Sequence, residues 1–165
     1  MKKYKYIIVG GGIVAGYAAR EFIKYSEYNE GDLAIITDDD AIPYERPPLS
    51  KDFLAGDEHY DDIQINSPDF YRDHGIDLYL YTRVNQINTT DKTVKTDHND
   101  IFHYEKLLLA TGSRAVELDL PGSDHSLIKY LRTVEDARSI RTALNESNKV
   151  VVIGGGYIGM ETAAS

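Results

Sequence analysis

Cysteine is absent from the 165-residue chain, and this absence excludes whole classes of chemistry. Without a thiol, these residues can form no disulfide, no thiolate metal site and no thiol-based catalytic centre. The five histidines are scattered along the sequence and do not have the spacing of metal ligands, so we interpret them as surface or turn residues. We therefore expect no metal site.

Long apolar runs and clusters of positive charge are also absent. No run approaches the length of a membrane span, and the residues before the first apolar run show no signal-peptide pattern. The net charge of −9 argues against binding nucleic acid through phosphate neutralisation. We therefore expect a cytoplasmic protein that binds neither nucleic acid nor membranes. The length suits one average domain, or a domain and a piece of another.

Three consecutive glycines follow the first apolar run, Tyr6–Val9. The run has no polar alternation, which is typical of a buried parallel strand, and the Ala-rich segment after the glycines is typical of a helix. The helix would direct its free N–H groups and the positive end of its dipole at the turn, which predicts a pyrophosphate site. The alternative is a strand–turn–helix without a nucleotide. The residues of this loop are Gly10, Gly11, Gly12 and Ala15.

An acidic residue, Asp38, ends the second apolar run, Leu33–Thr37. A carboxylate at this position typically accepts the ribose hydroxyls of a dinucleotide. Because Asp39 and Asp40 follow it, the alternative is a solvated loop acid. With a helix from Gly12 to Tyr25, the two strands form a β-α-β unit of normal length.

Residues 42–51 contain three prolines within six positions. Proline is incompatible with a helix interior, so we expect a rigid extended loop that presents Arg46 and Lys51. Ser50 is then expected to cap a short helix over Lys51–Ala55.

Turn residues divide the middle of the chain into short apolar pieces. A helix is predicted from Ser67–Pro68–Asp69 to His74, then a strand over Ile76–Tyr81. The spacing of the next pieces predicts a three-stranded antiparallel meander. Its strands are Arg83–Ile87, Thr93–Thr96 and Ile101–Tyr104.

A separate apolar strand is expected over Lys106–Gly112. The small residues at its end, Ala110, Thr111 and Gly112, would let the backbone pass close to a bound ligand. An amphipathic helix follows over Thr133–Leu144, with Thr133 and Asp136 approximating a capping box.

The last segment repeats the first. An apolar strand over Lys149–Ile153 precedes a second glycine-rich loop and the start of a helix. Two phosphate-binding turns in one chain suggest two dinucleotides, and such a pair suits an electron-transfer flavoenzyme. The second loop consists of Gly154, Gly155, Gly156, Tyr157, Ile158 and Gly159.

In combination, these segments resemble the FAD-dependent pyridine nucleotide-disulfide oxidoreductase family. The similarity is strongest to its non-thiol branch, that of monodehydroascorbate reductase, with ferredoxin and rubredoxin reductases and apoptosis-inducing factor as relatives. It covers essentially the whole chain, and it is specific in combination because five motifs occur in the family's order. They are Gly10–Phe22, Pro43–Lys51, Ala110–Ser113, Tyr130–Arg132 and Gly154–Glu161.

The resemblance implies an α/β, Rossmann-like FAD/NAD(P)-binding fold with a parallel sheet and the meander, apparently truncated. It divides the chain into an FAD-binding part (1–115), a connecting segment with a helix (116–147) and the start of an NAD(P)H-binding domain (148–165). Several relatives carry a redox disulfide in the region where this chain has its proline-rich loop. Electrons would therefore leave the flavin directly for an acceptor.

The resemblance also implies roles for individual residues. Lys51 and Glu161 would pair beside the flavin as the catalytic residues, because a buried carboxylate and ammonium are tolerable only together. The alternative for Glu161 is an exposed first-turn helix acid. The implied FAD contacts are Gly10, Gly11, Gly12, Ala15, Asp38, Arg46, Lys51, Val84, Ala110, Thr111 and Gly112. The implied NAD(P)H contacts are Gly154 to Gly159, with Glu161 close by.

The function implied is that of an oxidoreductase. Hydride would pass from NAD(P)H to FAD, and electrons would then pass to a small acceptor, such as monodehydroascorbate or a ferredoxin-like protein. One alternative is a flavin-binding regulatory or partner-binding module of the apoptosis-inducing-factor type, and another is a fragment that is inactive alone. The oligomeric state is not indicated.

Overall fold

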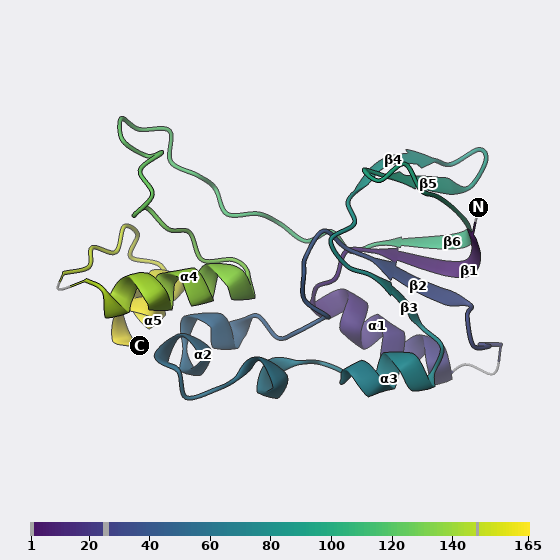
Figure 1. The fold of residues 1–165 in the computed structure, drawn as a ribbon, viewed down its shortest axis with the longest axis horizontal. Helices are drawn as coiled ribbons and strands as arrows, with labels where there is room; N and C mark the ends of the chain where they lie inside the picture. The colour runs from purple at the N-terminus through teal and green to yellow at the C-terminus, as the bar shows by residue number, and fades with distance from the viewer. Residues whose placement is uncertain (1, 25–26, 148) are drawn as a thin grey trace. The chain divides into compact units, whose positions relative to one another are not determined.

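A computed structural model describes residues 2–24, 27–147 and 149–165 and divides the chain into two compact units (Figure 1). We call the first the sheet unit, because it holds all the assigned strands. We call the second the helical unit. The sheet unit comprises the chain up to Tyr44 together with Gln64–Gly112, and the helical unit comprises Glu45–Ile63 and Ser113–Ser165.

A single six-stranded sheet forms the sheet unit, in the order β3-β2-β1-β6-β5-β4. Strands β1 (Lys2–Val9), β2 (Leu33–Ile36) and β3 (Asp77–Tyr79) run parallel to one another, and β6 (Ile101–Leu109) is parallel to β1. Strand β2 is buried along its whole length, which explains why its sequence is entirely apolar. The predicted fold class is confirmed.

Strand β6 corrects one prediction. The sequence suggested two strands, Ile101–Tyr104 and Lys106–Gly112, but the structure has one continuous strand. Its first half pairs with β5 in antiparallel orientation, while its whole length runs beside β1. The polar pair at Glu105 and Lys106 does not interrupt the strand, because both side chains are exposed.

The meander is formed by β4 (Val84–Asn88), β5 (Thr93–Thr96) and the first half of β6, as predicted. Val94 on β5 and Val84 on β4 pack with residues of β1 and β2 in one apolar cluster. The meander therefore covers one face of the parallel strands.

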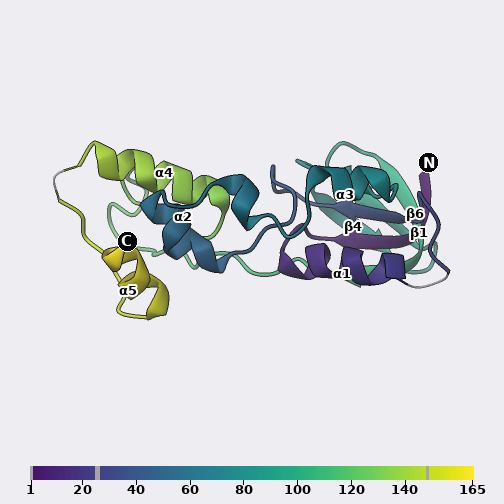
Figure 2. The ribbon, with the colours of Figure 1, turned by 90° about the horizontal axis from the view of Figure 1, so that it is seen from below.

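Helices α1 (Ile13–Lys24) and α3 (Pro68–Asp73) lie on the other face, in front of the strands in Figure 2. Ala15 and Ala19 of α1 are fully buried against Ile8 and Leu33 in a second apolar cluster. Small residues on this side of α1 allow the helix axis to approach the sheet closely.

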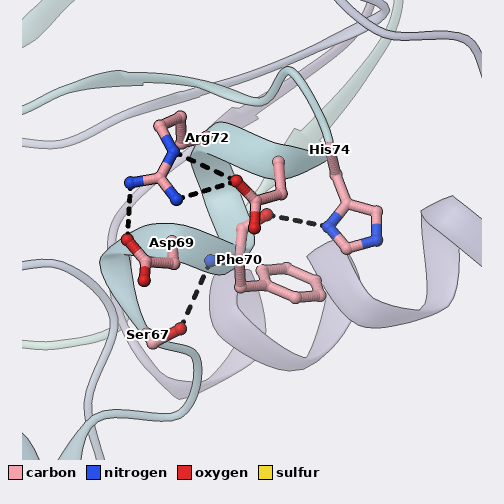
Figure 3. Close-up of polar contacts among 6 residues, drawn as sticks. Ser67, Asp69, Phe70, Arg72 and His74 are labelled. Atoms are coloured by element: carbon pink, nitrogen blue, oxygen red, sulfur yellow. Dashed lines mark hydrogen bonds and ion pairs between the residues drawn. The ribbon is translucent and has the colours of Figure 1, made fainter.

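Helix α3 begins and ends as the sequence predicts (Figure 3). The Ser67 hydroxyl accepts a hydrogen bond from the Phe70 N–H at 3.3 Å, and Pro68 occupies the first turn. Arg72 donates to Asp69 and to Asp73 on the exposed side. These contacts stabilise the short helix itself.

Asn66, just before α3, connects it to α1. The buried Asn66 amide donates to the Gly16 carbonyl at 2.8 Å and to the Tyr71 hydroxyl at 3.1 Å. Its carbonyl oxygen accepts from Arg20 Nε at 2.5 Å. Gly16 has no room for a side chain, because a Cβ there would meet Ile65 at 2.9 Å. This packing holds the first turns of α1 in place.

In the helical unit, the proline-rich segment departs from the prediction. Pro47–Ser50 forms a 3-10 helix, η1, and α2 follows over Asp52–Ala55. Proline suits the first position of a helical turn, so the prolines begin this turn rather than extend the chain. Ser50 does not cap α2: the residue at the cap is Lys51, without a side-chain cap.

The other elements of the helical unit are η2 (Tyr60–Ile63), α4 (Val134–Asn145) and α5 (Tyr157–Ala164). The predicted capping box of α4 is confirmed, with Thr133 and Asp136 exchanging both hydrogen bonds. None of the described helices is long and apolar enough to cross a membrane.

The prediction of a strand over Lys149–Ile153 is wrong. The structure assigns no strand to these five residues, and the Val151 side chain is 84% exposed. A parallel strand needs a hydrogen-bonding neighbour, and the described residues of the helical unit contain no strand to provide one. The predicted helix after the glycines nevertheless forms, as α5.

We predict that Asn66→Ala lowers the free energy of unfolding by about 1–3 kcal/mol, because it leaves buried partners of the amide unsatisfied. Urea unfolding followed by circular dichroism measures this change. Asn85→Ala on the exposed surface of β4 is the matched control and should change the free energy by less than about 0.5 kcal/mol. Equal effects of the two substitutions would contradict the role of Asn66.

Tyr28 predicts a pH dependence at alkaline pH. Burial, with the nearby Asp32 and Glu30 charges, raises the pKa of Tyr28 to about 12, and its hydroxyl donates to the His74 carbonyl at 2.7 Å. The stabilisation from the neutral hydroxyl is therefore complete below pH about 10 and is lost as the pH rises through about 12.

Phenolate absorbance checks this expectation. Tyr28→Phe should remove one ionisation near pH 12 and lessen the loss of stability between pH 10 and 12. Tyr157→Phe, which removes an exposed hydroxyl, should leave that ionisation in place. Persistence of the ionisation in Tyr28→Phe would show that it belongs to another tyrosine.

Candidate functional site

The carboxyl ends of three parallel strands meet at one edge of the sheet unit. Val9 of β1 lies opposite Ile36 of β2 on one side and Leu109 of β6 on the other. The pairing continues one step further, because Gly10 N–H donates to the Ile36 carbonyl and Ala110 N–H donates to the Val9 carbonyl, both at 2.8 Å. The segments that follow the three strands therefore leave the sheet together.

This edge is also where the strand order reverses. From β1 the chain passes through α1 to β2 and then to β3, whereas β6 lies on the opposite side of β1. Ligands of open α/β sheets bind at such a switch point, outside the carboxyl ends of the strands. The first glycine loop, Asp38 and Ala110–Gly112, predicted separately from the sequence, all follow strands that end here.

Gly10 is required by close backbone packing. Its φ of 113° lies in the left-handed region, and a Cβ at this position would collide with the Ala110 carbonyl. The turn after β1 and the turn after β6 are thus in direct backbone contact. This contact explains why both turns are built from small residues.

Thr37 is a site residue that sequence reasoning missed. A Cβ on Gly11 would meet the Thr37 hydroxyl at 2.7 Å, so the loop lies directly on this buried side chain. The hydroxyl in turn accepts from Asp39 N–H at 3.1 Å. A polar residue at the end of an otherwise apolar strand was the available signal.

Helix α1 begins directly after the glycine turn. Ile13 is its first residue, and the Gly12 carbonyl accepts from Gly16 N–H at 3.2 Å. The first N–H groups of an α-helix have no partner within the helix, and they carry the positive end of its dipole. Ala15, in the first turn, is fully buried against the sheet. This arrangement can bind an anion.

Asp38 is held by an arginine that the sequence did not reveal. Arg83 donates to Asp38 Oδ2 from Nη2 at 3.0 Å and from Nε at 3.2 Å. Both side chains are largely exposed. Their separation of 45 positions in sequence explains why the pair could not be predicted. Val84, the residue next to Arg83, begins β4 and pairs with Thr96.

The second glycine loop shares the positive φ of its first glycine with the first loop, but a Cβ on Gly154 would meet nothing within 4 Å, unlike one on Gly10. Gly154 has a φ of 116°, close to that of Gly10, and a Cβ on Gly159 would collide with the Gly154 carbonyl. Gly156 precedes α5, which begins at Tyr157. Tyr157 and Ile158 are exposed, with Tyr157 at 92%. The turn and helix therefore form without the strand.

Within the helical unit, Lys51 and Glu161 lie together, as the family resemblance implies, but their side chains are 47% and 33% exposed rather than buried. Lys51 Nζ is 3.5 Å from Glu161 Oε1, and the Ser50 hydroxyl donates to Glu161 Oε2 at 2.6 Å. The Ser50 hydrogen bond, together with the Lys51 charge, lowers the pKa of the Glu161 carboxyl. Ser50 was expected to cap a helix, and it contacts this carboxylate instead.

Arg46, in the proline-rich segment, contacts another part of the helical unit. Its Nη1 donates to the Arg132 carbonyl at 2.5 Å, and Arg132 Nε donates to the Ser113 carbonyl at 2.9 Å. These two hydrogen bonds connect the proline-rich segment to the chain before α4.

The predicted site residues thus fall into two groups, one in each unit. The sheet unit contains the first glycine loop, Asp38, Val84 and Ala110–Gly112, and the helical unit contains Arg46, Lys51, Glu161 and the second glycine loop. The sheet order and the strand-end site define a Rossmann-like α/β protein.

A family model described as pyridine nucleotide-disulphide oxidoreductase matches residues 4–165, and the chain belongs to this family. The resemblance seen in the sequence is confirmed. A monodehydroascorbate reductase from Cucumis sativus, the seedling isozyme, is 40% identical over 180 residues, covering 98% of this chain and 41% of that protein. An Arabidopsis thaliana protein, monodehydroascorbate reductase 2, is also 40% identical, over 99% of this chain and 41% of its own length.

Solved structures agree with this assignment. The NADH:rubredoxin oxidoreductase from Clostridium acetobutylicum matches with a TM-score of 0.87 and 30% identity, over 99% of this chain and 41% of that one. The reductase in a covalent putidaredoxin reductase–putidaredoxin complex matches with a TM-score of 0.86 and 37% identity, over 99% of this chain and 39% of that one. The chain therefore spans about two fifths of the length of these relatives.

We predict that Ser50→Ala raises the pKa of Glu161 toward its ordinary value of 4.5, because it removes the hydrogen bond that most favours the carboxylate. The contribution of this carboxylate to stability is present above pH about 4.5 and is lost as the pH falls through the lowered pKa. In Ser50→Ala the loss of stability as the pH falls should be smaller.

Carboxyl carbon NMR during a pH titration measures the change. Ser67→Ala, which removes the cap of α3 in the sheet unit, serves as the control and should leave the Glu161 titration unaltered. A Glu161 pKa that is the same in wild type and Ser50→Ala would contradict the role of Ser50.

Proposed function

We propose that the chain provides the first dinucleotide site, and part of the second, of an FAD-dependent NAD(P)H oxidoreductase. The observation that carries this proposal is the strand-end site of the sheet unit. There, Gly10 lies so close to the Ala110 carbonyl, and Gly11 so close to Thr37, that neither glycine has space for a side chain. Family membership supports the same conclusion.

The backbone around Gly12 and the N-terminal turn of α1 would hold the FAD pyrophosphate. These groups offer N–H donors and a positive dipole end to an anion. Asp38 would accept hydrogen bonds from the adenosine ribose, and the Val84 backbone would contact the adenine. Ala110–Gly112 would follow the cofactor along the neighbouring strand end, where the absence of bulky side chains allows close approach.

When bound, FAD supplies the chemistry of accepting a hydride and releasing its electrons to an acceptor. Lys51 and Glu161, whose charged groups lie 3.5 Å apart, would serve this flavin as a paired ammonium and carboxylate. Arg46 would lie along the same cofactor. The second glycine loop, ahead of α5, would hold the pyrophosphate of NAD(P)H.

We propose a small electron acceptor for the complete reaction, either a small molecule or a small redox protein. Relatives named for monodehydroascorbate support the first, and the structure of a reductase in complex with putidaredoxin supports the second. No nucleic acid or membrane takes part in this proposal.

We propose a cytoplasmic location. The names of relatives include both a cytosolic isozyme from rice and a peroxisomal one from Arabidopsis thaliana. Immunodetection in fractions of the source cell tests this proposal, and recovery of the protein in organelles would overturn it.

We predict that Gly12→Asp abolishes FAD binding, weakening it at least about a hundredfold, because a carboxylate would face the pyrophosphate at the helix N-terminus. The visible absorption spectrum of the purified chain after incubation with FAD measures this effect. Thr90→Asp is the matched control: it adds the same charge at an exposed position in the turn after β4. Retention of flavin by Gly12→Asp would overturn the proposed site.

A further inference from the structure

Arg83 is held in place by the meander. Its N–H donates to Asp97 Oδ1 at 3.1 Å, and its carbonyl accepts from Asp97 N–H at 2.9 Å. The turn between β5 and β6 thus fixes the backbone from which the Arg83 side chain extends. An arginine whose backbone is already fixed loses less conformational entropy when its side chain forms a contact.

The segment before Arg83 runs beside the end of β2. Thr82 N–H donates to the Thr37 carbonyl at 2.8 Å, and Tyr81 N–H donates to the Asp39 carbonyl at 3.1 Å. These backbone contacts, on either side of Asp38, bring the guanidinium to the Asp38 carboxylate. The ion pair is therefore a consequence of two fixed backbones.

The geometry of the pair leaves one carboxylate oxygen available. Both hydrogen bonds from Arg83 fall on Asp38 Oδ2, at 3.0 and 3.2 Å. In the described part of the chain, no hydrogen bond to Asp38 Oδ1 is present. An oxygen whose partner oxygen is fixed in this way can accept from a hydroxyl group with a defined direction.

The charges at this strand end have a second consequence. Asp38, Asp39 and Asp40 are consecutive carboxylates next to a loop that is proposed to receive a pyrophosphate. Arg83 places a positive charge on the first of them and so reduces repulsion of an anionic ligand.

We infer that Arg83 is a positioning residue of the adenosine end of the site: through Asp38 Oδ2 it directs the free oxygen of the carboxylate toward the ribose hydroxyls of a dinucleotide. This inference rests on the proposed function. As an exposed ion pair it contributes little to folding, so its effect should appear in ligand recognition.

The test compares FAD with an FAD analogue that carries 2′-deoxyadenosine, both measured by quenching of flavin fluorescence. We expect wild type to prefer FAD about tenfold, because the analogue leaves the carboxylate without its hydroxyl partner. In Arg83→Gln this preference should fall to about twofold. In Asp38→Asn it should fall similarly, and the double variant should show no further loss.

Arg72→Gln is the matched control. Arg72 is also an exposed arginine of the sheet unit, paired with Asp69 and Asp73 at distances similar to those in the Arg83 pair. Its substitution should leave the preference for FAD at the wild-type value. Circular dichroism of each variant verifies that the sheet unit is folded.

The possible outcomes separate the inference from the proposed function. If wild type binds neither ligand, the proposed function is contradicted, and the inference with it. If wild type binds FAD and Arg83→Gln keeps the tenfold preference, only the inference is overturned. Equal weakening of both ligands by Arg83→Gln, with the preference unchanged, would likewise overturn it by showing a merely structural role.

Discussion

The backbone contact between the turns after β1 and β6 is the constraint on which the sheet unit depends. Gly10 lies against the Ala110 carbonyl because the two parallel strands remain in register to their last residues. A side chain at Gly10 would separate the turns and move the N-terminus of α1 away from the sheet edge. The proposed anion site, the packing of Ala15 and the position of Ala110–Gly112 all follow from this contact.

A second set of contacts connects the meander to the same edge. The meander buries one face of the parallel strands through Val94, and its turn at Asp97 holds the backbone of Arg83. One supersecondary element therefore both covers the core and supplies a charged side chain to the strand ends. Stability and ligand recognition share this element, but they use different residues, so substitutions can separate the two roles.

The sequence predicted most helices and turns because interactions between residues close in the chain determine them. The Ser67 cap, the Thr133–Asp136 box and the glycine turns each depend on residues within a few positions. The errors arose where partners are distant in sequence. Lys149–Ile153 is apolar enough for a strand but has no strand to pair with among the described residues of its unit. The prolines of η1 begin a helical turn, and the Ser50 hydroxyl at its end donates to Glu161 instead of capping α2.

The sequence by itself determined the two glycine loops and the acid after β2, and its combination of motifs indicated the family; the pairing of Lys51 with Glu161 was implied only by the resemblance to that family. These follow from residue types at fixed short spacings, or from a combination of motifs in a fixed order. Only the tertiary structure decided that Thr37 supports the first loop, that Arg83 holds Asp38 and that Ser50 binds Glu161. Such contacts join residues far apart in the chain, so the packing of whole elements rather than local propensity determines which of them meet.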